Sequence, residues 1–276
     1  MEVLVQVLKG LILIILLLTF SHNSFGVYSN YTIFPEDLPE LVNDNKGASS
    51  FLEEDFIRIS NSLKELYASD FEEMGLSLIF NLFWDSSKVN ASTSQWGSIA
   101  YVNMYGGLAR HKYMSHNGFA MVICHEFGHH LGGAPYYSSS SWASAEGQSD
   151  YYAALKCFKR YLSEVCEGDE CLVDKKVVSN YLDDKCSGSL ECATTALAGL
   201  DIAKVIGGAR IKIKSHDPSV VAETYLSHPA AQCRMDTYLA GAICDKDVAS
   251  PDLCLRKNHD PEFSVRPLCW FKPDED

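Results

Sequence analysis

The sequence has no concentrated cluster of lysine and arginine residues, and nucleic-acid binding depends on such a surplus of positive charge. Its 276 residues include 23 Lys and Arg against 36 Asp and Glu, which gives a formal net charge of −13. Internal repeats and low-complexity tracts are also lacking. A content of 47% hydrophobic and 21% charged residues is typical of an ordinary globular protein. We therefore expect no nucleic-acid partner and no multi-spanning membrane domain.

No two cysteines have C-x-x-C spacing, so the sequence gives no support for a zinc ribbon or a thioredoxin-like redox motif. The chain nevertheless contains ten cysteines, and nine of them follow Ala143. An even number of cysteines in an exported chain predicts disulfides, although spacing alone does not define their connectivity. Cys124 shares a helical stripe with Ile123 and Phe127, which predicts either a buried thiol or one half of a tertiary disulfide.

The N-terminus carries an apolar run from Leu11 to Phe20, followed by small residues at the positions that signal peptidase requires for cleavage after Gly26. We therefore expect residues 1–26 to be a signal peptide and the chain to be exported, to the periplasm or the extracellular space. The alternative is an uncleaved membrane anchor, because the apolar stretch that begins at Val3 is almost long enough to span a bilayer.

Hydrophobic periodicity predicts an α+β protein with a small mixed sheet, an active-site helix and a mostly helical, disulfide-stapled second half. Residues 27–50 are expected to be an N-terminal extension or short propeptide. Residues 51–276 are expected to form one domain, with the sheet and active-site helix in 51–135 and the helical half in 136–276. The predicted strands are Leu76–Trp84 and Ser98–Tyr105, and the predicted helices are Phe51–Tyr67, Phe119–Leu131, Ala145–Leu162, Leu190–Ile206 and Ala230–Ile243.

The segment from His125 to His129 reads H-E-x-x-H inside a predicted helix. Positions i and i+4 share a helix face, so the two histidines can present imidazole nitrogens to one ion. Glu126 lies one step round the helix, where it can take a proton from a water molecule that the metal activates. The pattern predicts a zinc site with His125 and His129 as ligands and Glu126 as general base. A surface helix with two solvated histidines is the alternative.

A catalytic zinc site needs a third protein ligand and an open fourth position, and Glu146 at the start of the next predicted helix supplies that ligand. Asp150 lies one turn later on the same face. Its carboxylate can accept the remaining ring N–H of a ligand histidine and fix the tautomer. An acidic helix start favoured by the macrodipole would explain one carboxylate here, but not its coincidence with the upstream motif.

These motifs resemble those of the gluzincin peptidases, in which a later glutamate completes the zinc site. The segment from His228 to Arg234 is similar to the H-P-x-x-x-x-R signature of the CAAX prenyl protease and HtpX-like family. The resemblance implies a zincin-like fold, with His228 near the metal as a ligand or an oxyanion donor and Arg234 supporting the site. The alternatives are a helix cap for His228 and a surface or structural ion pair for Arg234. Met235 departs from the aliphatic residue usual in the family.

A metzincin site is excluded by counting, because its third histidine would fall at Pro135, which cannot ligate zinc. His130 points about 100° away from His129 and is expected to be a supporting or surface residue. The remaining histidines fit no ligand spacing; they are His22, His111, His116, His216 and His259.

The sequence thus predicts a zinc-dependent metalloendopeptidase that acts on a polypeptide substrate. We expect Ser98–Tyr105 to bind the extended substrate as an added edge strand. One alternative is an envelope zinc-binding or chaperone-like protein whose site is closed by His228 as a fourth ligand. Another is a disulfide-stapled structural protein in which the motif arose by chance.

Overall fold

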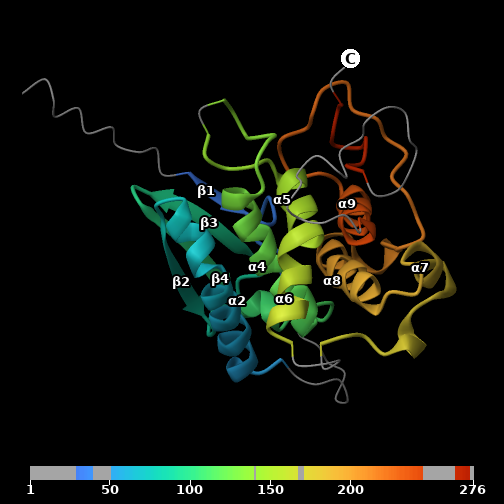
Figure 1. Ribbon diagram of the computed structural model, residues 1–276, viewed down its shortest axis with the longest axis horizontal. Coiled ribbons are helices and arrows are strands. Elements are labelled where there is room, and N and C mark those ends of the chain that lie inside the picture. The colour runs from blue at the N-terminus through green and yellow to red at the C-terminus, as the bar shows by residue number, and fades with distance from the viewer. Residues whose placement is uncertain (1–28, 40–50, 140, 167–170, 245–264, 274–276) are drawn as a thin grey trace, which may run out of the picture.

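The computed structural model describes residues 29–39, 51–139, 141–166, 171–244 and 265–273 (Figure 1). The predicted signal peptide, residues 1–26, lies outside these described residues, as does much of the predicted extension. The described part is a mixed α+β structure with one small sheet followed by a mostly helical half. The general architecture expected from the sequence is therefore confirmed.

A four-stranded mixed sheet forms one layer, with the strand order β1-β3-β4-β2. Strands β2 and β4 pair in parallel, whereas β3 runs antiparallel to both β1 and β4. The two predicted strands are present as β2 and β4, while β1 and β3 add to them. The bounds are β1 Asn30–Thr32, β2 Ser77–Phe83, β3 Ala91–Trp96 and β4 Ile99–Tyr105.

The expectation that an extended substrate adds to the strand Ser98–Tyr105 is wrong. Strand β4 lies inside the sheet, paired with β3 on one side and with β2 on the other. A peptide cannot add to a strand whose two edges are already hydrogen-bonded. The error arose because β3 is mostly polar, with Ser92, Thr93, Ser94 and Gln95 between Ala91 and Trp96, and lacks the hydrophobic alternation that marks a strand.

Two helices pack on the sheet and hold the main core, α2 (Glu53–Glu73) and α4 (His116–Leu131). Aromatic side chains join them: the Tyr67 ring lies 5.2 Å from that of Phe127. Helix α4 is buried nearly throughout, because it packs between the sheet and the helices of the second half (Figure 1). This packing explains why His125, His129 and His130 are buried and not surface residues.

The second half consists of helices packed beside α4 (Figure 1). The helix predicted over Ala145–Leu162 is one helical segment with a π-helical turn, η1, in its middle. Insertions of this kind occur frequently near functional sites. The helical bounds are α3 Gly106–Ala109, α5 Glu146–Tyr152, η1 Ala153–Cys157, α6 Phe158–Glu164, η2 Lys175–Val177, α7 Asn180–Lys185, α8 Leu190–Gly207, η3 Gly208–Arg210 and α9 Ala231–Ile243.

Disulfides staple the chain as expected, and they fit an oxidising, exported location. Of the two alternatives expected for Cys124, the structure contains the tertiary bridge: it pairs with Cys157 and so links α4 to η1. Cys244 is also disulfide-bonded, whereas Cys254 lies outside the described residues. The other bridges are Cys166–Cys171, Cys186–Cys192 and Cys233–Cys269.

One helical segment of the described chain, Leu190–Arg210, is long and apolar enough to cross a membrane. Its most hydrophobic window is 67% buried inside the protein. Helix α8 packs against α9 and α4, which is the environment of a core helix.

Candidate metal centre

Three potential metal ligands meet between α4 and α5: His125, His129 and Glu146. All three are fully buried, and their ligand atoms all lie within 4.8 Å of one another. One Glu146 oxygen, Oε2, is 3.3 Å from His125 Nε2, and the other, Oε1, is 3.6 Å from His129 Nε2. Two successive helices thus bring a pair of imidazoles and one carboxylate to a common point.

Small residues allow the two helices to approach so closely. A Cβ atom added at Gly128 would lie 2.8 Å from the Cα atom of Ser149, so only glycine fits where α4 crosses α5. A Cβ atom added at Gly147 would likewise lie 2.3 Å from the ring of Trp270. Glu146 is therefore held between α4 and the C-terminal segment.

Hydrogen bonds fix the tautomers of both histidines. His125 donates from Nδ1 to Asp150 Oδ1 at 2.7 Å, and His129 donates from Nδ1 to the carbonyl of Ser144 at 2.9 Å. In the neutral form of each ring, with its one proton on Nδ1, the Nε2 atom carries a lone pair. Both Nε2 atoms and Glu146 Oε2 are buried and have no hydrogen-bond partner. Buried polar atoms without partners need an explanation, and a bound metal ion supplies one.

Asp150 and Arg234 form a buried ion pair behind the histidines. Arg234 donates from Nε to Asp150 Oδ2 and from a terminal nitrogen to Oδ1, each at 2.7 Å. Tyr238 also donates to Asp150, and Arg234 donates to the carbonyl of Ile33. Arg234 is fully buried, so the surface ion pair considered from the sequence is not what the structure contains.

Burial and neighbouring charges set the protonation of the cluster. Burial raises the pKa of Glu126 to about 8 and lowers that of His129 to about 4. Burial also acts to lower the pKa of His125, but the neighbouring carboxylates of Asp150 and Glu146 together outweigh it and raise this pKa to about 9. In Glu146, burial is outweighed by the two histidines, and its pKa lies well below the usual range. The cluster thus combines an anionic ligand with a carboxyl group, Glu126, that readily holds a proton.

Glu126 follows the ligand His125 in α4 and is not one of the three residues whose ligand atoms converge. Its side chain is fully buried, and neither carboxylate oxygen has a hydrogen-bond partner. A buried carboxyl group in this state is available to a water molecule held at the metal site.

His228 lies next to the cluster but is not one of its three members. Its Nε2 atom is 3.3 Å from Glu146 Oε1 and donates to the carbonyl of Thr32 at 2.7 Å. Helix α9 begins three residues later without a side-chain cap, so His228 is not the cap considered from the sequence. Burial lowers its pKa, which favours the neutral ring.

Tyr137 is a site residue that the sequence did not indicate. It lies in the loop between α4 and α5, and its hydroxyl donates to Glu146 Oε1 at 2.6 Å. Its ring contacts that of Tyr31, with the centroids 4.5 Å apart. Sequence spacing does not predict a contact between a loop tyrosine and a residue of a helical motif. The only feature of the sequence that pointed to this loop was the pair of tyrosines directly after Pro135.

Of the two roles expected for His130, a supporting or a surface residue, the surface role is wrong. It is 5% exposed, and its Nε2 atom is 2.8 Å from Thr93 Oγ1. Its ring stacks on that of Trp142, with the centroids 4.4 Å apart. His130 therefore joins α4 to β3 and to the loop before α5.

A second cluster of potential ligands in the described chain does not form a metal site. It consists of Asp217, Cys233 and Cys269. The two cysteines form a disulfide with each other, so neither offers a thiolate.

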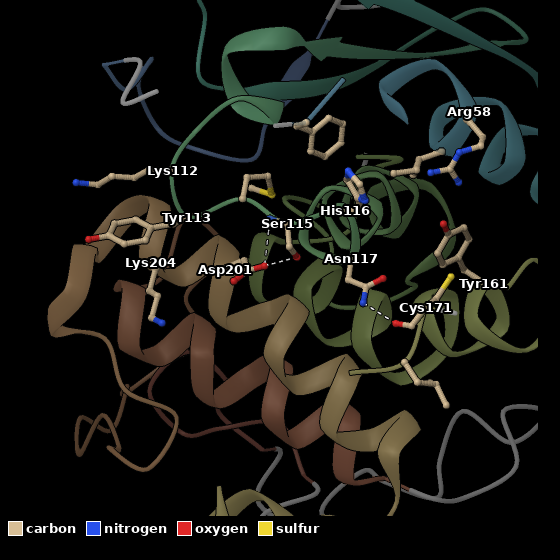
Figure 2. A pocket seen from close by; sticks show the side chains of 14 residues that line it. Arg58, Lys112, Tyr113, Ser115, His116, Asn117, Tyr161, Cys171, Asp201 and Lys204 are labelled. Atoms are coloured by element: carbon tan, nitrogen blue, oxygen red, sulfur yellow. Dashed lines mark hydrogen bonds between the residues drawn. The ribbon is translucent and has the colours of Figure 1, made fainter. Parts of the chain in front are cut away.

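A cavity of about 810 Å³ lies at the N-terminal end of α4, where Ser115, His116 and Asn117 contribute to its lining (Figure 2). Ser115, the N-cap of α4, donates from its backbone nitrogen and its hydroxyl to Asp201 of α8. Burial raises the pKa of Asp201 to about 6. The lining includes no member of the metal cluster, so the cavity is not part of the candidate centre.

No protein-family model, curated protein or solved structure that was compared with the chain matches it. The resemblance of its motifs to the CAAX prenyl protease and HtpX-like family therefore stays a prediction.

Proposed function

We propose that the protein is a zinc-dependent endopeptidase. The observation that carries this proposal is the convergence of two histidine Nε2 atoms and Glu146 Oε2, all buried and without partners, beside an equally unpartnered Glu126. Two imidazoles and one carboxylate are a ligand set of catalytic zinc, with a fourth position open. Calcium and magnesium instead prefer sites made entirely of oxygen ligands.

In the proposed reaction, the metal ion activates a water molecule and Glu126 transfers the proton. Zinc, when bound, supplies Lewis acidity and makes a water molecule nucleophilic near neutral pH. Glu126 accepts a proton from this water while the water oxygen attacks the carbonyl carbon of the scissile peptide bond. The same proton then passes to the leaving amine as the C–N bond breaks. Burial suits Glu126 to this role, because a carboxyl group that exchanges its proton near the working pH is the better acid and base.

His228 is proposed to stabilise the oxyanion. Its Nε2 atom already donates to a peptide carbonyl, that of Thr32, close to the metal ligands. A donor that binds a peptide carbonyl in this place can donate to the carbonyl of a substrate as negative charge develops on it. The segment from His228 to Arg234 resembles the H-P-x-x-x-x-R signature, and this resemblance supports the same role for His228.

Replacing the base while keeping the ligands tests the proposal. We expect Glu126→Gln to bind zinc as the wild type does and to lose cleavage of casein by about a hundredfold or more, since glutamine cannot take the proton. Glu54→Gln, on the exposed surface of α2, is the matched control and should cleave normally. A Glu126→Gln protein that cleaves at the wild-type rate would contradict the assignment of the base.

A zinc-binding protein without turnover is the second candidate, and the 3.3 Å between His228 and Glu146 is the observation that favours it. In that case His228 would move to close the site as a fourth ligand. Zinc content and chelator-sensitive cleavage are measured on the same preparation. Bound zinc without cleavage, in both the wild type and His228→Ala, would favour the binding protein over the peptidase.

A further inference from the structure

The chain's own N-terminal strand covers the edge of the sheet at the metal centre. Strand β1 runs antiparallel along β3, with Asn30 opposite Ser94 and Thr32 opposite Ser92 (Figure 1). Extended peptides bind to sheet edges in this manner, through main-chain hydrogen bonds. Ser94, covered in this way, is fully buried and its hydroxyl has no partner. Strand β1 thus takes the place on β3 that a bound peptide would take.

The covering strand also contacts the residues assigned to chemistry. The carbonyl of Thr32 accepts the hydrogen bond from His228, the donor proposed for the oxyanion. The Tyr31 ring stacks on that of the ligand His129, with the centroids 5.5 Å apart. A peptide of this chain therefore makes the contacts that a substrate would need.

The side chain of Tyr31 lies against three aromatic rings. Besides His129, it contacts the rings of Tyr137 and Trp142, with centroid distances of 4.5 and 5.2 Å. Its hydroxyl lies 3.2 Å from Ser141 Oγ, within hydrogen-bonding distance. Neighbours of this kind favour a flat ring with a polar tip and give little contact to a small side chain.

The residues that follow β1 are much more deeply buried than the strand itself. Asn30 is exposed and Tyr31 and Thr32 are half-buried, whereas Ile33 and Phe34 are fully buried in the core. Asn90 binds Phe34 through both main-chain groups, at 3.2 and 3.3 Å. The strand can therefore leave β3 while the next two residues stay anchored in the core.

We propose that Asn30–Thr32 occupy the peptide-binding edge of β3 as an internal peptide, and that substrate enters when this strand leaves. The substrate class is an extended polypeptide whose aromatic side chain takes the place of the Tyr31 ring. The cleavage of the bound peptide rests on the proposed function, whereas the replacement of β1 by a peptide on β3 does not.

Loosening the strand tests the proposal by activity. We expect the zinc-loaded full chain with Tyr31→Ala to cleave peptides that carry a tyrosine about tenfold faster than the wild type, because aromatic contacts and a hydrogen bond of the strand are lost. Tyr136→Ala, an exposed neighbour in the same loop as Tyr137, is the matched control and should leave the rate unchanged. An equal or slower rate for Tyr31→Ala would overturn the proposal.

Amide hydrogen exchange tests the same strand without relying on activity. We expect the amides of residues 30–32 to exchange by local opening, faster than those of β4 and faster still in Tyr31→Ala. If these amides exchange as slowly as those of β4, strand β1 does not leave β3, and the proposal is overturned. Fast exchange together with bound zinc, but no cleavage by either protein, would support the internal peptide and contradict the peptidase.

Discussion

At the scale of residues, one carboxylate connects the metal ligands to the core. Asp150 accepts from His125 on one side and from Arg234 on the other, and all three side chains are fully buried. The charge of Arg234 lowers the pKa of Asp150 against the effect of burial, so this carboxylate stays ionised. An ionised Asp150 keeps the proton of His125 on Nδ1 and leaves Nε2 free for a metal.

Replacing this carboxylate should weaken metal binding. In Asp150→Asn, the amide neither fixes the tautomer of His125 as firmly nor balances the charge of Arg234. We expect the dissociation constant for zinc, measured by competition with a chelating dye, to rise by about ten- to a hundredfold. Asp85→Asn, on the exposed surface, provides the control. Unchanged affinity in Asp150→Asn would show that the carboxylate does not act on the metal.

At the scale of elements, the long helices were predictable and two of the strands were not. Helices α4, α8 and α9 carry apolar residues over three or more turns, and their predicted bounds differ from the observed ones by at most three residues. Strand β1 has three residues and β3 is mostly polar, so neither has a periodic pattern. Their stability comes from pairing with partners distant in the sequence, which local periodicity does not contain.

The disulfide between α4 and η1 should matter more for stability than a local one. Cys124 and Cys157 are 33 residues apart in sequence, whereas Cys166 and Cys171 are 5 apart. Closing the longer loop restricts the unfolded chain more strongly. Double replacement by alanine should lower the free energy of unfolding, measured with urea, by roughly 4 kcal/mol for the first pair and roughly 2 for the second. Equal losses would contradict this account of the bridge.

At the scale of the whole molecule, the candidate site depends on both ends of the described chain. Ile33 near the N-terminus accepts from Arg234, and Trp270 near the C-terminus packs on Gly147 beside Glu146. The sequence revealed His125, Glu126 and the other motif residues because helical spacing places them locally. Contacts made by loop and strand residues, such as Tyr137 with Glu146 or Thr32 with His228, arise only from the folded chain.

His125, His129 and Glu146 are proposed to hold one zinc ion. X-ray absorption at the zinc edge, on the purified chain with its disulfides intact, is the decisive measurement. We expect about one zinc ion per chain, with only nitrogen and oxygen neighbours at about 2.0–2.2 Å and two imidazole ligands. We also expect zinc to be lost in Glu146→Ala. Sulfur neighbours at about 2.3 Å, or zinc retained in full by Glu146→Ala, would contradict this proposal.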